Sequence, residues 1–170
     1  MKYALAVNKV ADDIGKNIET IVEDIYEAKE NEADMIIFPE CCITVLIKND
    51  IPEHDLALRL NEKSSVIQCI CECATRNGIY VSISFLEVDG GALYDSAICI
   101  DYRGMIISKY RRISDGWHGP HADKSIYRLG SSIQTFSIDK STYSYLICGD
   151  LFDDDLVAEI KSKDVDILIF

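Results

Sequence analysis

The sequence lacks the features that accompany a membrane span or export. It contains no run of about 18 apolar residues, the length that a membrane-spanning helix needs. The opening stretch MKYALAVNKVADD has too short an apolar segment for a signal peptide, and acidic residues follow at once. We therefore expect a cytoplasmic protein that makes no membrane contact.

Basic residues are also scarce. The 170-residue chain has 17 Lys and Arg against 29 Asp and Glu, for a net charge of −12. Only one short basic cluster stands out, formed by Lys109, Arg111 and Arg112. Because nucleic-acid binding needs a basic face for the phosphates, we expect no nucleic-acid partner.

No C-x-x-C pair occurs among the seven cysteines. Cys69, Cys71 and Cys73 stand two residues apart, so on a helix Cys69 and Cys73 would share a face and Cys71 would point away. The loop at 114–123 adds two histidines and two aspartates, which is a thin donor set for zinc. We expect free thiols in a reducing compartment, and no metal or other cofactor.

The first half of the chain alternates apolar runs with helical patterns. A short apolar run at 3–7 and a second at 35–38 flank a helical pattern that begins at Asp12 or Asp13, which predicts a βαβ unit with parallel strands. A second helix is expected from about Ser64 to Arg76, with Gly78 beyond its end.

The second half favours hairpins and a final strand. We expect strands at 79–88, 92–101, 105–110, 133–138, 143–148 and 165–170, with a short helix at 155–163. Parallel strands are normally buried on both faces, whereas nothing follows the last strand in this sequence. We therefore expect one domain, residues 1–170, that another segment completes at its C-terminal side.

Three residues with reactive side chains each follow an apolar strand. They are Glu40 after MIIFP, Arg112 after MIISKYR and Cys148 after YSYLI. Ligand sites in open α/β sheets gather at the carboxyl ends of strands, and a thiol, a carboxylate and a cation together are suited to acyl transfer. Taken singly, each residue also fits an ordinary role, as a solvated charge or a buried thiol.

Several motifs in this order resemble the nitrilase superfamily, the carbon–nitrogen hydrolases. The resemblance covers essentially the whole chain. It implies an α/β fold, a nitrilase-like αββα sandwich of which this chain supplies roughly the N-terminal half to two-thirds. The motifs that carry it are IIFPE at 36–40, RGMIISKYRRI at 103–113, the step from Asp123 to Gly130, and ICGD at 147–150.

The resemblance also implies roles for individual residues. Glu40 matches the family's general base, and Cys148 matches the nucleophile that forms a thioester or thioimidate. The backbone N–H of Gly149 would contribute to the oxyanion site. Trp117, in the loop between the motifs, is predicted to line the substrate pocket or to contact a partner subunit.

Two positions depart from the family pattern. Arg112 stands where the family has its catalytic lysine, and Asp123 stands where a second glutamate is expected, so that Asp123 would orient Arg112 or Glu40. Arginine can donate hydrogen bonds to an oxyanion, but it is wider, planar and effectively never deprotonated. Lys109 is a poor substitute, because an odd offset on a strand puts it on the opposite face.

The sequence therefore predicts a carbon–nitrogen hydrolase that cleaves a small amide, or alternatively a nitrile, through Cys148. It is expected to form a homodimer or a higher homo-oligomer. Two alternatives stay open at this point. The departures at Arg112 and Asp123 also fit a catalytically silent relative that binds a small molecule or a protein partner, and the uncovered last strand also fits a structural subunit.

Overall fold

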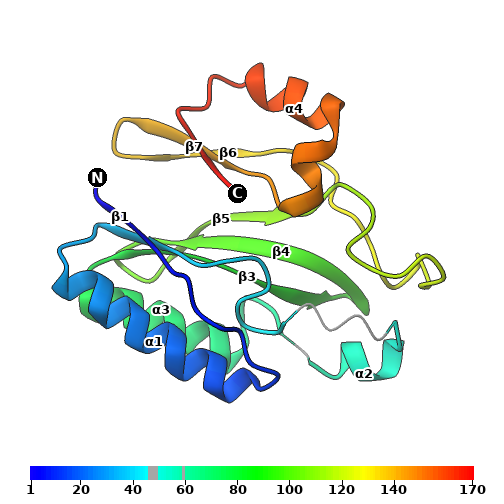
Figure 1. The fold of residues 1–170 in the computed structure, drawn as a ribbon, viewed down its shortest axis with the longest axis horizontal. Helices are drawn as coiled ribbons and strands as arrows, with labels where there is room; N and C mark the ends of the chain where they lie inside the picture. Colours follow the sequence, from blue (N-terminus) through cyan, green and yellow to red (C-terminus); the bar gives the residue numbers. More distant parts are fainter. Residues whose placement is uncertain (46–49, 59) are drawn as a thin grey trace.

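The protein folds into four layers, with two sheets packed between helices (Figure 1). A computed structural model describes residues 1–45, 50–58 and 60–170. A five-stranded sheet carries α1 and α3 on its outer face, and a three-stranded sheet lies between its inner face and α4. The αββα order predicted from the sequence is confirmed.

The N-terminal βαβ unit forms as its pattern predicts. Strands β1 (Tyr3–Leu5) and β2 (Met35–Ile37) pair in parallel, and α1 (Ile14–Glu30) connects them. Asp13 caps α1, because its side chain accepts a hydrogen bond from the backbone N–H of Lys16. The helix buries one face against the sheet, through Asn17, Ile21, Ile25 and Ala28.

Helix α3 (Ser65–Asn77) lies beside α1 and ends at Gly78, which has the expected left-handed conformation. The sequence predicts that Cys69 and Cys73 share one face of this helix and that Cys71 lies on another; in the structure Cys71 and Cys73 are both buried. Cys71 stands four residues after Ile67, so it falls on the same buried stripe, whereas Cys69 is exposed. A further short helix, α2 (Pro52–Leu56), has only five residues and carried no clear periodic signal.

The larger sheet continues as a meander. Strand β3 (Tyr80–Asp89) is parallel to β2, and β4 (Ala92–Ile100) is antiparallel to both β3 and β5 (Ile106–Arg111). Strands β2, β3 and β5 therefore run in the same direction. The residues that follow β2 and β5 consequently emerge at the same edge of the sheet.

The smaller sheet has the order β6–β7–β8, with bounds Thr135–Ile138, Ser141–Tyr145 and Ile167–Ile169. The strand predicted to extend to Cys148 ends at Tyr145, and a short 3-10 helix, η1 (Cys148–Phe152), follows. Helix α4 (Asp154–Lys161) then covers the outer face of this sheet.

Two apolar clusters hold the layers together. One lies between the helices and the larger sheet, and it includes Ile21, Ile25, Ile67, Ile70, Ile83 and Phe85. The other lies between the two sheets and includes Met35, Ala97, Tyr110, Tyr143, Tyr145 and Ile147. Among the described residues, no helix has both the length and the apolar character to cross a bilayer.

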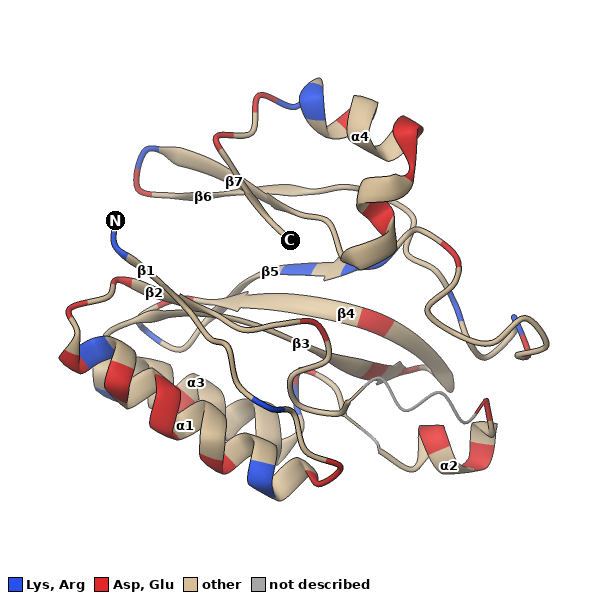
Figure 2. Ribbon diagram, viewed as in Figure 1, with Lys and Arg blue, Asp and Glu red and all other residues tan. Residues whose placement is uncertain are grey.

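Charged side chains are unevenly distributed over these layers (Figure 2). Acidic residues follow the outer side of α1 and occur on α2 and at the start of α4. Basic residues gather on β5, where Lys109 and Arg111 lie on one side of the strand and pair with Glu87. Arg112, the next residue, therefore points to the other side, toward the space between the sheets.

Candidate active site

Glu40 lies in the turn that ends β2. Pro39 stops the strand, and the turn is held by Ser84 of β3. The Ser84 hydroxyl donates to the carbonyl oxygen of Pro39 at 3.2 Å and accepts from the backbone N–H of Cys41. These two bonds fix the backbone on both sides of Glu40, whose side chain remains 28% exposed.

Arg112 follows β5 directly, and its guanidinium lies against Glu40. Its side chain is only 5% exposed, and Nη1 lies 3.2 Å from Glu40 Oε1 and 3.6 Å from Asp95 Oδ2. Nε donates to Ser114 Oγ at 3.0 Å, and Nη2 donates to the carbonyl oxygen of Asp115 at 3.3 Å. The guanidinium is thus held in one orientation by acceptors on three of its edges.

Asp95 is the carboxylate that the sequence reasoning missed. It lies in the middle of β4, its side chain is completely buried, and its Oδ1 lies 3.6 Å from Cys41 Sγ. Burial, followed by the hydrogen bond and the charge of Glu40, raises the pKa of Asp95 to about 8, against the opposing charge of Arg112. The available signal was an acid inside the apolar strand ALYDSAICI.

Cys148 lies where β7 gives way to η1, and it is exposed. Its φ of +42° is in the left-handed region, which a non-glycine residue adopts only where the surrounding structure fixes it. The next residue, Gly149, lies directly against Arg112. A Cβ on Gly149 would overlap Arg112 Nη2 and come within 2.9 Å of Ser114 Oγ, so only glycine fits without moving the guanidinium.

The Asp150 carboxylate links the turn that contains Cys148 to the residues that follow β5. Its buried carboxylate accepts from the backbone N–H of Ile147 at 2.9 Å, and from those of Ile113 and Ser114 at 3.1 and 2.6 Å. The Tyr110 hydroxyl donates to the same carboxylate at 2.7 Å. One side chain therefore sets the position of Cys148 relative to Arg112.

Glu40 and Cys148 line one cavity of about 40 Å³ between the sheets. Ser82 and Ser84 supply hydroxyl groups on its β3 side, and Ser82 Oγ lies 2.8 Å from the Tyr145 hydroxyl. Most of the remaining wall is apolar. It consists of Phe38, Ile83, Ala97, Leu146, Ile147, Ile169 and Phe170.

Four of the six predicted site residues do not line this cavity: Arg112 and Gly149 lie against each other beside Glu40 and Cys148, whereas Asp123 and Trp117 make other contacts. Asp123 is exposed, and its carboxylate accepts from the backbone N–H and the hydroxyl of Ser125, which stabilises the turn at 123–127. Trp117 is 3% exposed and packs against Tyr127 in an apolar cluster. Cys41, the residue after Glu40, belongs to the same cluster.

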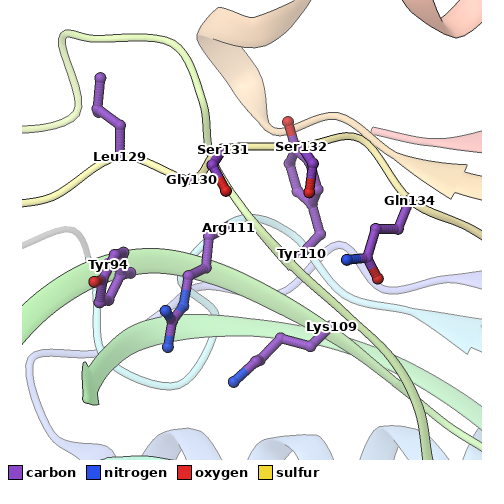
Figure 3. A pocket seen from close by; sticks show the side chains of 9 residues that line it. All are labelled: Tyr94, Lys109, Tyr110, Arg111, Leu129, Gly130, Ser131, Ser132 and Gln134. Atoms are coloured by element: carbon purple, nitrogen blue, oxygen red, sulfur yellow. The ribbon is translucent and has the colours of Figure 1, made fainter. Parts of the chain in front are cut away.

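A second cavity, of about 290 Å³, lies along β5 (Figure 3). Arg111 and Lys109 project into it, together with Tyr94, whose ring lies 3.7 Å from the guanidinium carbon of Arg111. Both cations are already paired with Glu87, at 2.7 and 3.0 Å. The residues that line the Figure 3 cavity include neither the predicted nucleophile, Cys148, nor the predicted base, Glu40.

The comparisons with known proteins agree on one family. Residues 4–170 match the carbon-nitrogen hydrolase family. A citrullinase from Francisella tularensis is 27% identical over 177 residues, which cover 100% of this chain and 60% of the relative. A glutamine-dependent NAD(+) synthetase from Thermotoga maritima is 25% identical over 149 residues, which cover 86% of this chain and 25% of the relative.

A solved amidase from Nesterenkonia sp. shares the fold, with a TM-score of 0.82 at 19% identity, covering 99% of this chain and 63% of that chain. This chain thus spans less than two-thirds of the length of these relatives. Since the family match extends over nearly all of the 170 residues, the chain belongs to the carbon-nitrogen hydrolase family of the nitrilase superfamily.

Proposed function

We propose that this chain carries the catalytic residues of a hydrolase that cleaves the carbon–nitrogen bond of a small amide through a thioester on Cys148. The observation that carries the proposal is the position of Arg112. Its guanidinium contacts Glu40 on one side and lies against Gly149, next to Cys148, on the other. The base and the nucleophile line one cavity, and the fixed cation contacts the base.

In the first half of the reaction, Glu40 takes the proton of the Cys148 thiol, and the thiolate attacks the amide carbon. The oxyanion that develops is bound by the N–H of Gly149 and by Arg112. A guanidinium has five N–H donors, of which three make the hydrogen bonds described above, and we assign the second N–H of Nη2 to the oxyanion. Collapse breaks the C–N bond, and Glu40 returns its proton to the departing ammonia or amine.

In the second half, Glu40 takes a proton from water, and the hydroxide attacks the thioester carbon. The C–S bond breaks, Cys148 recovers a proton from Glu40, and the carboxylic acid leaves. The net reaction consumes one water and yields an acid and an amine.

The cavity wall and one solved relative favour a small, uncharged acyl group. The wall of the cavity is mostly apolar, which suits an uncharged acyl group. Among the solved relatives, an active-site mutant of the Nesterenkonia amidase holds butyramide, and acrylamide has added to the active-site cysteine of another mutant. Butyramide is therefore the first substrate to test.

The test is ammonia release from butyramide and shorter amides. Cys148→Ala should lower the rate by more than about 10³-fold, because the nucleophile is lost. Cys69→Ala is the matched control, since Cys69 is the other exposed thiol and lies on α3. Turnover that survives Cys148→Ala at the wild-type rate overturns the proposal.

A second candidate is a relative that binds an amide without cleaving it. The observation in its favour is the pairing of Arg112 with Glu40, because this ion pair at 3.2 Å occupies the carboxylate that would have to accept the proton of the thiol. Ammonia release by the wild type distinguishes the two. A silent binder shows amide binding by calorimetry and no ammonia release, and Arg112→Lys, which restores the family's lysine, should then give turnover.

A further inference from the structure

Two carboxyl groups face a single guanidinium at the centre of the site. Arg112 Nη1 lies 3.2 Å from Glu40 Oε1 and 3.6 Å from Asp95 Oδ2. The Asp95 side chain has no exposed surface. If both carboxyl groups were ionised, one negative charge would remain uncompensated in the protein interior, which is strongly unfavourable.

The contacts of the two Asp95 oxygens show which of them a proton would occupy to remove the uncompensated charge. Oδ1 lies 3.6 Å from Cys41 Sγ, whereas Oδ2 is buried and has no hydrogen-bond partner within residues 1–45, 50–58 and 60–170. Arg112 is too distant from Oδ2 for a good hydrogen bond. Two ionised carboxylates are both acceptors, so one proton between Asp95 and Glu40 would supply the missing bond.

We propose that Asp95 is a positioning residue, which holds one proton between itself and Glu40 at neutral pH and so leaves Glu40 as the carboxylate that pairs with Arg112. The proposal rests on the proposed function, in which Glu40 is the base. Asp95 lies within strand β4, whereas Glu40, Arg112 and Cys148 each follow the end of a strand.

The titratable and charged groups that face Asp95 come from two elements. Glu40 and Cys41 belong to the turn after β2, and Arg112 follows β5. Burial, followed by the charges of Asp95 and Glu40, raises the pKa of the Cys41 thiol well above its ordinary value, so Cys41 stays neutral. Asp95 is then the group in this set that takes up a proton near pH 8, with Glu40 as its hydrogen-bond partner.

The consequence for the reaction follows from the charge. While Asp95 is protonated, its O–H donates to Glu40 and holds the base beside Arg112. When Asp95 loses the proton, its negative charge lies beside Glu40 and favours transfer of the Cys148 proton toward that carboxylate. Amide turnover should therefore rise as the pH passes through about 8.

The direct test is carbon-13 NMR of carboxyl-labelled Asp and Glu between pH 4 and 10. We expect one carboxyl titration near pH 8 in the wild type and none there in Asp95→Asn. In Glu40→Gln the like charge is removed, so the Asp95 titration should move down by about one pH unit or more. If every carboxyl group of the wild type titrates below about pH 6, the proposal is wrong.

The pH profile of turnover tests the positioning role. Asp95→Asn keeps the shape of the side chain, and we expect neutral-pH turnover within about tenfold of wild type but no rise through pH 8. Asp89→Asn, an exposed acid that pairs with Arg111, is the matched control and should keep the rise. A rise that persists in Asp95→Asn overturns the role. If no variant turns over any amide, the proposed function fails, and the NMR titration still decides whether the proton is shared.

Discussion

The orientation of the Arg112 guanidinium depends on the absence of a side chain at Gly149. The guanidinium is planar and wider than an ammonium group, and it lies flat against Gly149. A lysine at this position would need less room and would bind as a point charge. Arg112 can therefore keep this orientation only while residue 149 is glycine.

Gly149→Ala should move Arg112, because the added Cβ overlaps Nη2. We expect amide turnover to fall by about 10²-fold, the cost of losing one oxyanion donor. The double variant Gly149→Ala/Arg112→Lys should recover part of the rate, since the lysine head group is smaller. Equal turnover in Gly149→Ala and wild type would show that Arg112 does not depend on this contact.

At the scale of elements, the site is assembled by the connection between β5 and η1. Asp150 accepts three backbone N–H donors and the Tyr110 hydroxyl, and these donors come from both segments. Because the carboxylate is buried, its removal leaves these donors without a side-chain acceptor. The turn that presents Cys148 thus depends on a partner two residues along the chain.

We expect Asp150→Ala to lower the free energy of unfolding by about 3–5 kcal/mol, because it leaves buried donors without an acceptor. Asp153→Ala is the matched control. Asp153 caps α4 through Asp155 and Leu156, and its loss should cost only about 1 kcal/mol. Urea denaturation measures both, and equal losses would contradict the account of Asp150.

Local patterns predicted most of these elements, and long-range contacts explain the rest. Asp13 and Gly78 mark helix ends in both the sequence and the structure, because capping depends on neighbouring residues only. The early end of β7 at Tyr145 follows from Asp150, which bends the chain through bonds to residues 36 and 37 positions away. Asp95 could not be linked to Glu40 without knowing which strands are neighbours.

At the scale of the whole molecule, two buried acids give opposite pH dependences. Burial acts to raise the pKa of Glu87, but the hydrogen bonds from Arg111, Ser96 and Lys109 outweigh it, and the pKa is lowered. Glu87 therefore stabilises the fold above its unfolded pKa of about 4.5, and this stabilisation is lost as the pH falls through its lower folded value. Asp95 has the reverse sign, because its folded pKa is raised.

Between pH 4 and 8 the unfolded chain has released the proton of Asp95, whereas the folded chain still holds it. Stability should therefore decrease as the pH rises over this interval. Asp95→Asn cannot titrate, so its melting temperature should exceed that of the wild type by an amount that grows from pH 4 to pH 8. Thermal melts at several pH values check this, and a constant difference would contradict the raised pKa.

The central claim is that the chain assembles an activated thiol at Cys148, and alkylation by iodoacetamide at pH 7 tests it most directly. Cys148 and Cys69 are both exposed, so their difference in rate measures activation rather than access. Cys42 and Cys99 are internal references, because burial raises the pKa of each to about 12 and they should not react.

We expect Cys148 to react at least about tenfold faster than Cys69, and Glu40→Gln to slow Cys148 while leaving Cys69 unchanged. Peptide mass mapping resolves the individual thiols. If Cys148 and Cys69 react at the same rate, and Glu40→Gln changes neither, then Cys148 is an ordinary surface thiol and the proposed site is not assembled.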